Sequence, residues 1–258
     1  MFSAYSASLR SACMSRQVGA AISDTEGRIL ATGCNDVPKF GGGLYDTDDD
    51  DDKRCFGYKS GDCHNDKHKN LLKTQIEEIL KENKVPNSAN LAMQIMSNSK
   101  AKSLIEYSRA IHAEMDAIVS LARDTTTSTT GKILYCTTYP CHSCARHIVA
   151  AGIKKVVYIE PYEKSLALDL HDDAICLVDD QKPNKVIFEN FEGASHNRYS
   201  KFFAYSKKKK AHGKVIEYKI IDEEHLDTQP LDCYGDYELK VVEMTNEMLG
   251  EDNYMMPV

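Results

Sequence analysis

The chain is arranged around two short stretches, Ile111-His112-Ala113-Glu114-Met115 and Tyr139-Pro140-Cys141-His142-Ser143-Cys144. Together they supply an imidazole, two thiols and a carboxylate. Cys141 and Cys144 are three residues apart, so at the start of a helix their sulfur atoms lie on one face and can share a metal ion. The free N–H groups and positive dipole of that helix end favour thiolates. The pattern predicts a zinc ion held by His112, Cys141 and Cys144.

Three protein ligands leave one tetrahedral position open, which distinguishes a catalytic zinc from a structural one. A water molecule in that position has its pKa lowered to roughly 7. Glu114 is predicted to shuttle the proton of that water to the substrate and then to the leaving group. The alternative is that His112 and Glu114 lie on an ordinary helix, while the two cysteines form a redox pair or half of a structural site. The strand-like run before the second stretch favours the catalytic interpretation.

Length and composition are those of an ordinary globular protein. The 258 residues are 42% hydrophobic and 28% charged, near the soluble average. No run approaches 18 apolar residues, and residues 1–5 lack the basic start of a signal peptide, so we expect a cytoplasmic protein without a membrane span. Nine cysteines fit reduced thiols and metal ligands better than a disulfide framework. The formal charge of −7 argues against a generally basic nucleic-acid surface.

Hydrophobic periodicity predicts an alternation of helices and strands. The expected helices cover residues 2–16, 70–83, 89–107, 112–122, 141–151 and a short piece at 165–170. The expected strands cover residues 18–22, 29–33, 133–137, 156–159, 185–188 and 215–221. The first two strands form a hairpin, and the strand, helix and strand of 133–159 form a parallel right-handed crossover. The prediction is an α/β fold with a mixed central sheet and helices on both faces.

Domain boundaries follow from composition. We expect one domain over residues 1–175, interrupted at about 41–107 by a polar, helical insertion, and a C-terminal extension over 176–258 that packs on the same domain. The tail from residue 227 shows no clear period. Six aspartates between Asp46 and Asp52 predict an exposed acidic loop. The basic run 207–210 is interpreted as a solvated loop, with phosphate binding as the alternative.

Four motifs in order resemble the deoxycytidylate deaminases of the zinc-dependent cytidine deaminase superfamily. They are Ser15-Arg16-x-Val18-Gly19-Ala20, Thr32-Gly33-x-Asn35 before a proline, His112-Ala113-Glu114-Met115-x-Ala117-Ile118 and Pro140-Cys141-x-x-Cys144. The resemblance covers residues 3 to about 160. It implies a three-layer α/β/α cytidine deaminase-like fold, Zn²⁺ as cofactor and a homo-oligomer.

A narrower resemblance is to the deaminase half of bacterial anti-phage deoxycytidine nucleotide deaminases. It rests on Asn35-Asp36-Val37-Pro38-Lys39-x-Gly41-Gly42-Gly43-x-Tyr45, Glu160-Pro161-Tyr162-x-Lys164-Ser165-Leu166-Ala167 and His171-x-Asp173-Ala174-Ile175. It implies conversion of dCTP or dCMP to the deoxyuridine nucleotide and ammonia, which depletes the pool that a phage needs. Such proteins carry a P-loop kinase-like half, and no GxxxxGK[ST] occurs here. We therefore expect a deaminase-only member or an excised domain.

The resemblance also implies roles for individual residues. Asn35 would hydrogen-bond the deoxyribose or the base edge, or it would simply end a strand. Tyr162 would stack on the base or pack in the core, and Ala113 is expected to contact the substrate. The phosphate is expected to find cations among Arg16, Lys39, Arg109 and Lys164. The resemblance also suggests a second, structural zinc in the insertion at Cys55, Cys63, His64 and His68, whose spacing is C-x₇-C-H-x₃-H; the alternative is that His64 and His68 have this spacing by chance on a polar stretch.

Two other functions compete with this interpretation. A polynucleotide deaminase acting on tRNA or single-stranded DNA would need a basic groove studded with aromatic residues, and the chain has no Trp and a negative net charge. An inactive module that binds nucleotides as a regulator would have no use for the carboxylate of Glu114. Both remain alternatives to a deoxycytidine nucleotide deaminase.

Overall fold

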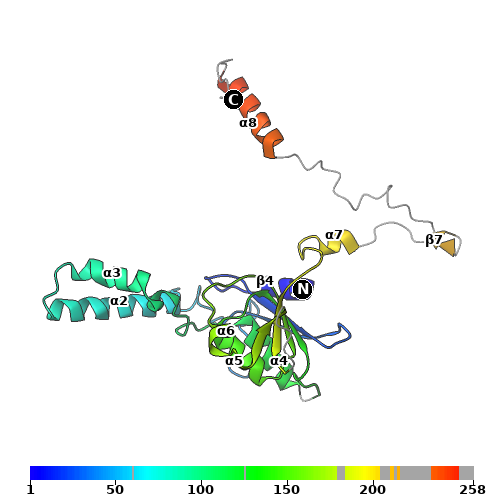
Figure 1. The fold of residues 1–258 in the computed structure, drawn as a ribbon, viewed down its shortest axis with the longest axis horizontal. Coiled ribbons are helices and arrows are strands. Elements are labelled where there is room, and N and C mark those ends of the chain that lie inside the picture. The colour runs from blue at the N-terminus through cyan, green and yellow to red at the C-terminus, as the bar shows by residue number, and fades with distance from the viewer. Residues whose placement is uncertain are drawn as a thin grey trace. The chain divides into compact units, whose positions relative to one another are not determined.

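The computed structural model describes residues 1–59, 61–124, 126–178, 184–203, 210–211, 214–215 and 234–249. The chain divides into two units, Met1–His196 and Asn197–Val258 (Figure 1). Helices of the first unit are α1 (Phe2–Ser8), α2 (His64–Glu82), α3 (Ser88–Asn98), the 3₁₀ turn η1 (Lys100–Ser103), α4 (Ala113–Arg123), α5 (His142–Ala150) and α6 (Ala167–Leu170). Its strands are β1 (Gly19–Ser23), β2 (Ile29–Cys34), β3 (Ile133–Thr138), β4 (Lys155–Glu160), β5 (Ile175–Leu177) and β6 (Val186–Asn190).

The six strands form one mixed sheet in the order β2-β1-β3-β4-β6-β5. The hairpin β1–β2 and the pair β1–β3 are antiparallel, while β3, β4, β6 and β5 run parallel to their neighbours. The predicted hairpin, the parallel crossover through α5 and the α/β class are confirmed. Strand β6 belongs to this sheet although it follows residue 175.

Two glycines allow helices to approach the sheet closely from opposite faces. A side chain at Gly19 would lie 2.0 Å from the carbonyl oxygen of Ala4 in α1. A side chain at Gly33 would lie 2.3 Å from the carbonyl oxygen of Ala113 in α4. Gly33 pairs with Ala20, the neighbour of Gly19, and successive residues of a strand face opposite sides. Helices α1 and α4 therefore cover opposite faces of β1 and β2.

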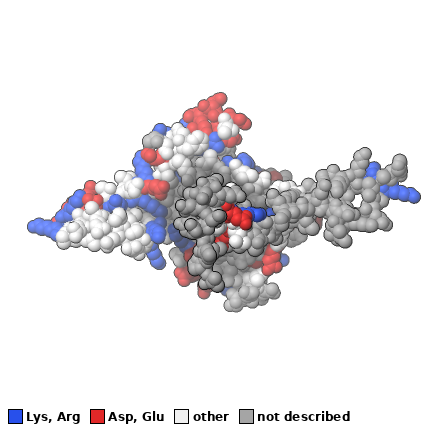
Figure 2. All heavy atoms as spheres, turned by 90° about the horizontal axis from the view of Figure 1, so that it is seen from above, with Lys and Arg blue, Asp and Glu red and all other residues white. Residues whose placement is uncertain are grey.

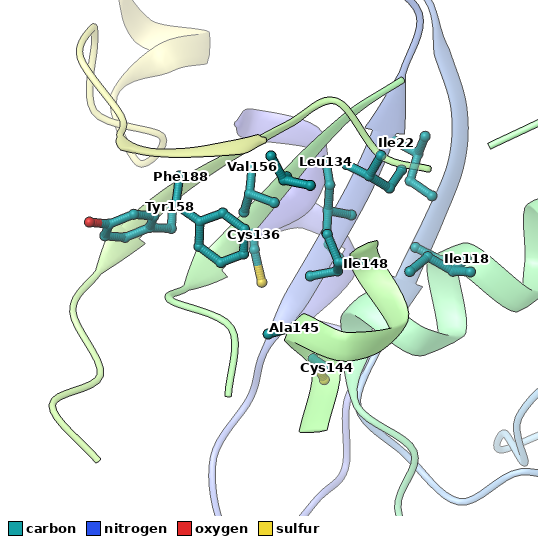
Figure 3. Close-up of a cluster of buried hydrophobic side chains, with 14 of the residues drawn as sticks. Ile22, Ile118, Leu134, Cys136, Cys144, Ala145, Ile148, Val156, Tyr158 and Phe188 are labelled. Atoms are coloured by element: carbon teal, nitrogen blue, oxygen red, sulfur yellow. The ribbon is translucent and has the colours of Figure 1, made fainter. Parts of the chain in front are cut away.

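The main core lies between the sheet and helices α4 and α5. Alternate residues of the strands point into it, and Figure 3 shows them facing Ile118 of α4 and Ile148 of α5. The sulfur of Cys136 points from β3 toward α5 (Figure 3). The largest fully buried side chains include Phe188, Ile22, Leu121, Leu134, Ile148 and Ile153. This packing fixes where the first turns of α4 and α5 lie.

The insertion contains a helical hairpin made by α2 and α3, which pack against each other. Helix α2 begins at His64, six residues before the predicted start, and the second predicted helix is divided into α3 and η1. Lys and Arg side chains line the edges and tip of this hairpin, at the left of Figure 2. The hairpin carries five lysines over residues 64–84, whereas the loop before it carries the six aspartates.

The helix predicted over residues 2–16 is wrong beyond Ser8. There the hydroxyl of Ser11 donates to the carbonyl of Asn35 at 2.6 Å, and the N–H of Ala12 donates to the carboxylate of Asp36 at 2.8 Å. The bond to Asp36 takes the N–H of Ala12, which a continuing helix would need, and the bond from Ser11 fixes the chain beside Asn35. Strand β5 was not predicted.

The second unit contains α7 (Tyr199–Phe203), the short pair β7 (Lys210–Ala211) and β8 (Lys214–Val215), and α8 (Tyr234–Leu249). Helix α8 was not predicted. Of the strand expected over 215–221, all but residue 215 lies outside the described residues, as does most of the basic run 207–210. Among the residues that the structure describes, no helix is both long and apolar enough to cross a membrane.

Candidate functional site

Two helix N-termini bring the predicted metal ligands together. His112 is the N-cap of α4 and Cys141 is the N-cap of α5, both with extended backbone, and Cys144 lies in the first turn of α5. The Nδ1 atom of His112 is 3.4 Å from the sulfur of Cys141 and 3.3 Å from that of Cys144. All three ligand atoms lie within 4.8 Å of one another, and within the described ranges they form the sole such group of three.

The geometry of these three atoms fits zinc. A tetrahedral zinc, with Zn–S of about 2.3 Å and Zn–N of about 2.0 Å, holds its sulfur and nitrogen ligands about 3.5 Å apart. The observed separations of 3.3 and 3.4 Å are close to this value. Two thiolates and an imidazole are also the soft donors that zinc prefers. The donor set therefore fits Zn²⁺ with room for a fourth ligand.

The two thiols are electrostatically unequal. A hydrogen bond from Cys144 lowers the pKa of Cys141, and the backbone N–H of Cys144 also donates to the Cys141 sulfur at 3.4 Å. The pKa of Cys144 is raised, first by its hydrogen bond to Cys141 and then by burial. Without a cation, the pair therefore favours one thiolate and one thiol. A bound dication stabilises both thiolates, which is the form that ligates metals.

Glu114 lies in the first turn of α4, two residues after His112, and is only 4% exposed. Burial raises the pKa of this carboxyl group, against the opposing influence of His112. A carboxyl group with a raised pKa can both take up and release a proton near neutral pH. The group lines the same cavity as His112 and Cys141, so it faces the space beside the metal ligands.

A cavity of about 220 Å³ opens onto this centre. Its wall includes the predicted residues Arg16, Asn35, Ala113 and Tyr162. The side chain of Asn35 is engaged with the protein, because its Oδ1 accepts the N–H of Val18 at 2.7 Å and its Nδ2 donates to the carbonyl of Arg16 at 2.7 Å. A primary amide has two N–H donors and two lone pairs, so one of each is left for a substrate.

Of the four cations expected at the phosphate, Arg16 alone is on the cavity wall. Its guanidinium pairs with the carboxylate of Glu160 at the end of β4. Lys39 is bound to Asp49 at 2.6 Å instead, which raises the pKa of the lysine. Arg109 donates to the carbonyl of Lys53 at 3.0 Å and stacks on the ring of Tyr58. Lys164 is exposed and is not part of the wall.

Sequence reasoning missed several residues of the cavity wall. The amide of Asn65 in α2 reaches it from the insertion and donates to the carbonyl of Leu104 at 3.3 Å. Other missed members are Cys13, Ser15, Val18, Ile105, Ser108, Ala110, Thr138 and Tyr139. Ser15 and Val18 belong to a quoted motif, so motif membership was a usable signal for them. Asn65 and Ser108 carry no local signal, because only the fold brings the insertion to the metal.

Three of the four residues expected to bind a second zinc lie around one cavity. Cys55, Cys63 and His64 line one small cavity, together with Cys13, which the sequence did not suggest. His68 is not part of that wall, and its ring lies 5.3 Å from the ring of Tyr107. Burial raises the pKa of Cys55 and lowers that of His64. Three thiols and an imidazole therefore border this cavity without the close approach seen at the first centre.

Comparison with known proteins agrees with the first centre. Residues 1–160 match the model of the cytidine and deoxycytidylate deaminase zinc-binding region. Deoxycytidylate deaminase of Enterobacteria phage T4 is 32% identical over 162 residues, which cover 63% of this chain and 76% of the phage protein. ComE operon protein 2 of Bacillus subtilis is 46% identical over 55 residues, 21% of this chain and 29% of that protein.

The dCMP deaminase of cyanophage S-TIM5 in complex with dCMP and dUMP is 22% identical, with a TM-score of 0.42 over 73% of this chain and 90% of that one.

Proposed function

The chain belongs to the cytidine and deoxycytidylate deaminase family, and from that membership we propose that it hydrolyses the C4 amino group of dCMP, giving dUMP and ammonia. The observation that carries the proposal is the meeting of His112, Cys141 and Cys144 with the buried carboxyl group of Glu114 on one cavity. The T4 phage relative, which is named a deoxycytidylate deaminase, supports the substrate class.

The chain's own residues account for the proton transfers. When bound by His112, Cys141 and Cys144, zinc supplies a Lewis acid that lowers the pKa of water. Glu114 accepts a proton from the attacking water and delivers it to the ring nitrogen N3 of cytosine, while the oxygen bonds to C4. It then moves the second proton to the amino group, the C4–N4 bond breaks and ammonia leaves. Positioned transfers of this kind contribute about 10²- to 10⁴-fold to a rate.

The charges around the cavity favour a monophosphate over a triphosphate. Arg16 is the one cation among its wall residues, and Glu160 already offsets part of its charge. A phosphate monoester carries about two negative charges at pH 7, which one guanidinium can bind in bidentate fashion. The larger charge of dCTP would need further cations, and Lys39 and Arg109 are held elsewhere. We therefore propose dCMP as the preferred substrate.

The competing functions have less support. A polynucleotide groove needs several cations and stacked aromatic rings beside the reacting base. The cavity wall has one arginine and two tyrosines, Tyr139 and Tyr162. An inactive regulator would not need a carboxyl group kept 4% exposed beside the metal ligands, because burying it costs free energy.

We also propose the second zinc site at Cys55, Cys63, His64 and His68. Two observations support it. Cys55, Cys63 and His64 line the same cavity, and their thiol and imidazole groups are ligands that zinc prefers. Metal analysis tests the proposal directly. The proposal is supported if the native chain binds two zinc ions and Cys55→Ala binds one. It is rejected if the native chain and Cys55→Ala both bind one. The homo-oligomer, the kinase-like partner domain and the anti-phage role remain predictions from the resemblance.

Glu114→Gln is the decisive variant for the activity. The purified chain is incubated with dCMP, dCTP, deoxycytidine and single-stranded DNA, and ammonia release is followed. We expect dCMP to be preferred, and Glu114→Gln to keep its zinc while losing at least about 10²-fold in kcat. Glu78→Gln, at an exposed position of α2, is the matched control and should behave as the native protein. Ammonia from DNA alone, or full activity of Glu114→Gln, would overturn the proposal.

A further inference from the structure

Asp36 is a buried acidic residue, 3% exposed, that directly follows Asn35. It accepts three hydrogen bonds from backbone N–H groups of three segments. Oδ2 accepts from Ala12 at 2.8 Å, Oδ1 accepts from Val37 at 2.8 Å, and the main-chain carbonyl accepts from Ile111 at 2.9 Å. The carboxylate thus holds Ala12 and Val37 through bonds to a charged group, whereas the bond to Ile111 is made by the main chain and does not depend on the side chain.

Two of these segments border the candidate active site. Ala12 begins the loop of residues 12–18, which supplies Cys13, Ser15, Arg16 and Val18 to the cavity wall. Ile111 directly precedes the metal ligand His112. The carboxylate of Asp36 therefore holds the loop that carries the arginine of the cavity, and the main chain of the same residue holds the segment that carries the imidazole.

The neighbouring residue holds the other end of the same loop. Asn35 accepts from the N–H of Val18 and donates to the carbonyl of Arg16, both at 2.7 Å. Asn35 and Asp36 thus form a clamp, with Asp36 holding the start of the loop and Asn35 holding its end. The backbone of Arg16 is fixed between the two attachment points, although its side chain is about half exposed at 48%.

We propose that Asp36 is a positioning residue for the phosphate end of the substrate, acting through the loop of residues 12–18. The inference rests on the proposed function, because it assigns Arg16 to the phosphate. The carboxylate suits this position better than an amide does. Its two oxygens each accept one N–H group, whereas Asn would direct an NH₂ group at one of the two donors.

The buried negative charge has a nearby counterion. Arg54 is 6% exposed and bound to Asp52 at 2.7 Å. The pKa of Arg54 is raised mainly by that hydrogen bond and further by the charges of Asp52 and Asp36. The charge of Arg54 therefore also interacts favourably with the carboxylate of Asp36.

Asp36→Asn and Asp36→Ala test the proposal, with Asp50→Asn and Asp50→Ala at an exposed position of the acidic loop as matched controls. We expect KM for dCMP and Kd for dUMP to rise about tenfold in the Asp36 variants, which is the loss of roughly one hydrogen bond to a charged group. Their kcat should stay within about threefold, and their zinc content should not change. Kd for deoxyuridine, which has no phosphate, should change by less than about threefold.

A merely structural role gives a different result. Partial unfolding lowers the active fraction, so kcat falls equally for all substrates while KM and both Kd values stay the same. That outcome overturns the proposal. If Asp36→Ala does not fold, Asp36→Asn decides the question, because it keeps the size and one acceptor of the side chain.

Hydrogen exchange of the peptide covering residues 10–18 tests the clamp without any activity. Exchange should be faster in Asp36→Asn than in the native chain, and equal rates overturn the proposal. If the native chain does not deaminate dCMP, the proposed function fails while hydrogen exchange still decides whether the clamp exists. Faster exchange with an unchanged Kd for dUMP shows a clamp that does not position the substrate, which also overturns the proposal.

Discussion

A methyl group at Gly33 should displace the first turn of α4, which carries Glu114. In Gly33→Ala the new Cβ would lie 2.3 Å from the carbonyl oxygen of Ala113 and 2.4 Å from the nitrogen of Ala117. Both are backbone atoms, so no side-chain rotation relieves the contact. Ordinary contact begins at 3.4 Å, and β2 and α4 must therefore separate by about 1 Å. Ala113 stands between His112 and Glu114, so both functional side chains move with it.

The magnitude follows from this displacement. Forcing an extra methyl group into a packed interior costs about 1–3 kcal/mol. In a domain of this size each kcal/mol lowers Tm by about 2–4 °C, so we expect a decrease of roughly 2–12 °C. A misplacement of about 1 Å at reacting groups can reduce the rate about 10²-fold. The catalytic loss should therefore exceed what the fraction of unfolded protein explains.

The assay combines steady-state deamination of dCMP, thermal unfolding and zinc content on one preparation. Gly57→Ala is the matched control, because a side chain there meets nothing within 4 Å. It should keep its Tm and its kcat/KM. Gly33→Ala with native kcat/KM would show that the close contact between β2 and α4 does not position Glu114, and the reasoning would be refuted.

Three further results are expected. Phe188→Ala removes a fully buried side chain of β6, so it should lower the free energy of unfolding by about 3–5 kcal/mol, measured by urea denaturation. A loss below about 1 kcal/mol would contradict the core described above. Without zinc at pH 8, one of the two thiols should be ionised, because the pKa of Cys141 is lowered, chiefly by its hydrogen bond with Cys144, while that of Cys144 is raised; the ultraviolet absorbance of the thiolate, compared with that of Cys141→Ser, measures it, and equal absorbance in both proteins would argue against a preformed thiolate. The hydrogen bond from Arg28 lowers the pKa of Asp24, so this pair stabilises the fold above the unfolded pKa of about 3.9 and loses that effect as pH falls through the folded pKa. Asp24→Asn should therefore be destabilised at pH 6 and match the native chain in strong acid, and an equal difference at both pH values would contradict this assignment.

The metal centre was predictable because its information is local. Cys141 and Cys144 are one helical turn apart, and Glu114 follows His112 by two residues, so two short stretches fix all four side chains once their helices begin. The regular strands around them were predictable for the same reason, since compact apolar runs with β-branched residues mark β3 and β4.

The rest of the wall depends on long-range contacts. Asn35 was expected to hydrogen-bond the substrate or simply to end a strand, and Asp36 was given no role, yet both residues hold the loop of residues 12–18. Lys39 was predicted to bind the phosphate, but it pairs with Asp49 instead. This ion pair depends on how the acidic loop folds back, which the sequence near Lys39 does not indicate. Asn65 reaches the cavity only because the whole insertion returns to it. No short sequence pattern predicts these long-range contacts.

The placement of His112 and Cys141 at helix N-caps affects the ionisation of the two thiols and of the Glu114 carboxyl group. His112 and Cys141 both occupy the position where a helix leaves N–H groups unpaired, and the Cys141 sulfur accepts one of them, from Cys144. The positive ends of two helix dipoles therefore converge on two sulfurs and the carboxyl group of Glu114. They favour negative charge on the thiols, whereas burial opposes charge on Glu114 and raises its pKa. The same backbone geometry thus favours a thiolate at Cys141, whereas burial leaves the carboxyl group of Glu114 able to exchange protons, as hydrolytic deamination requires.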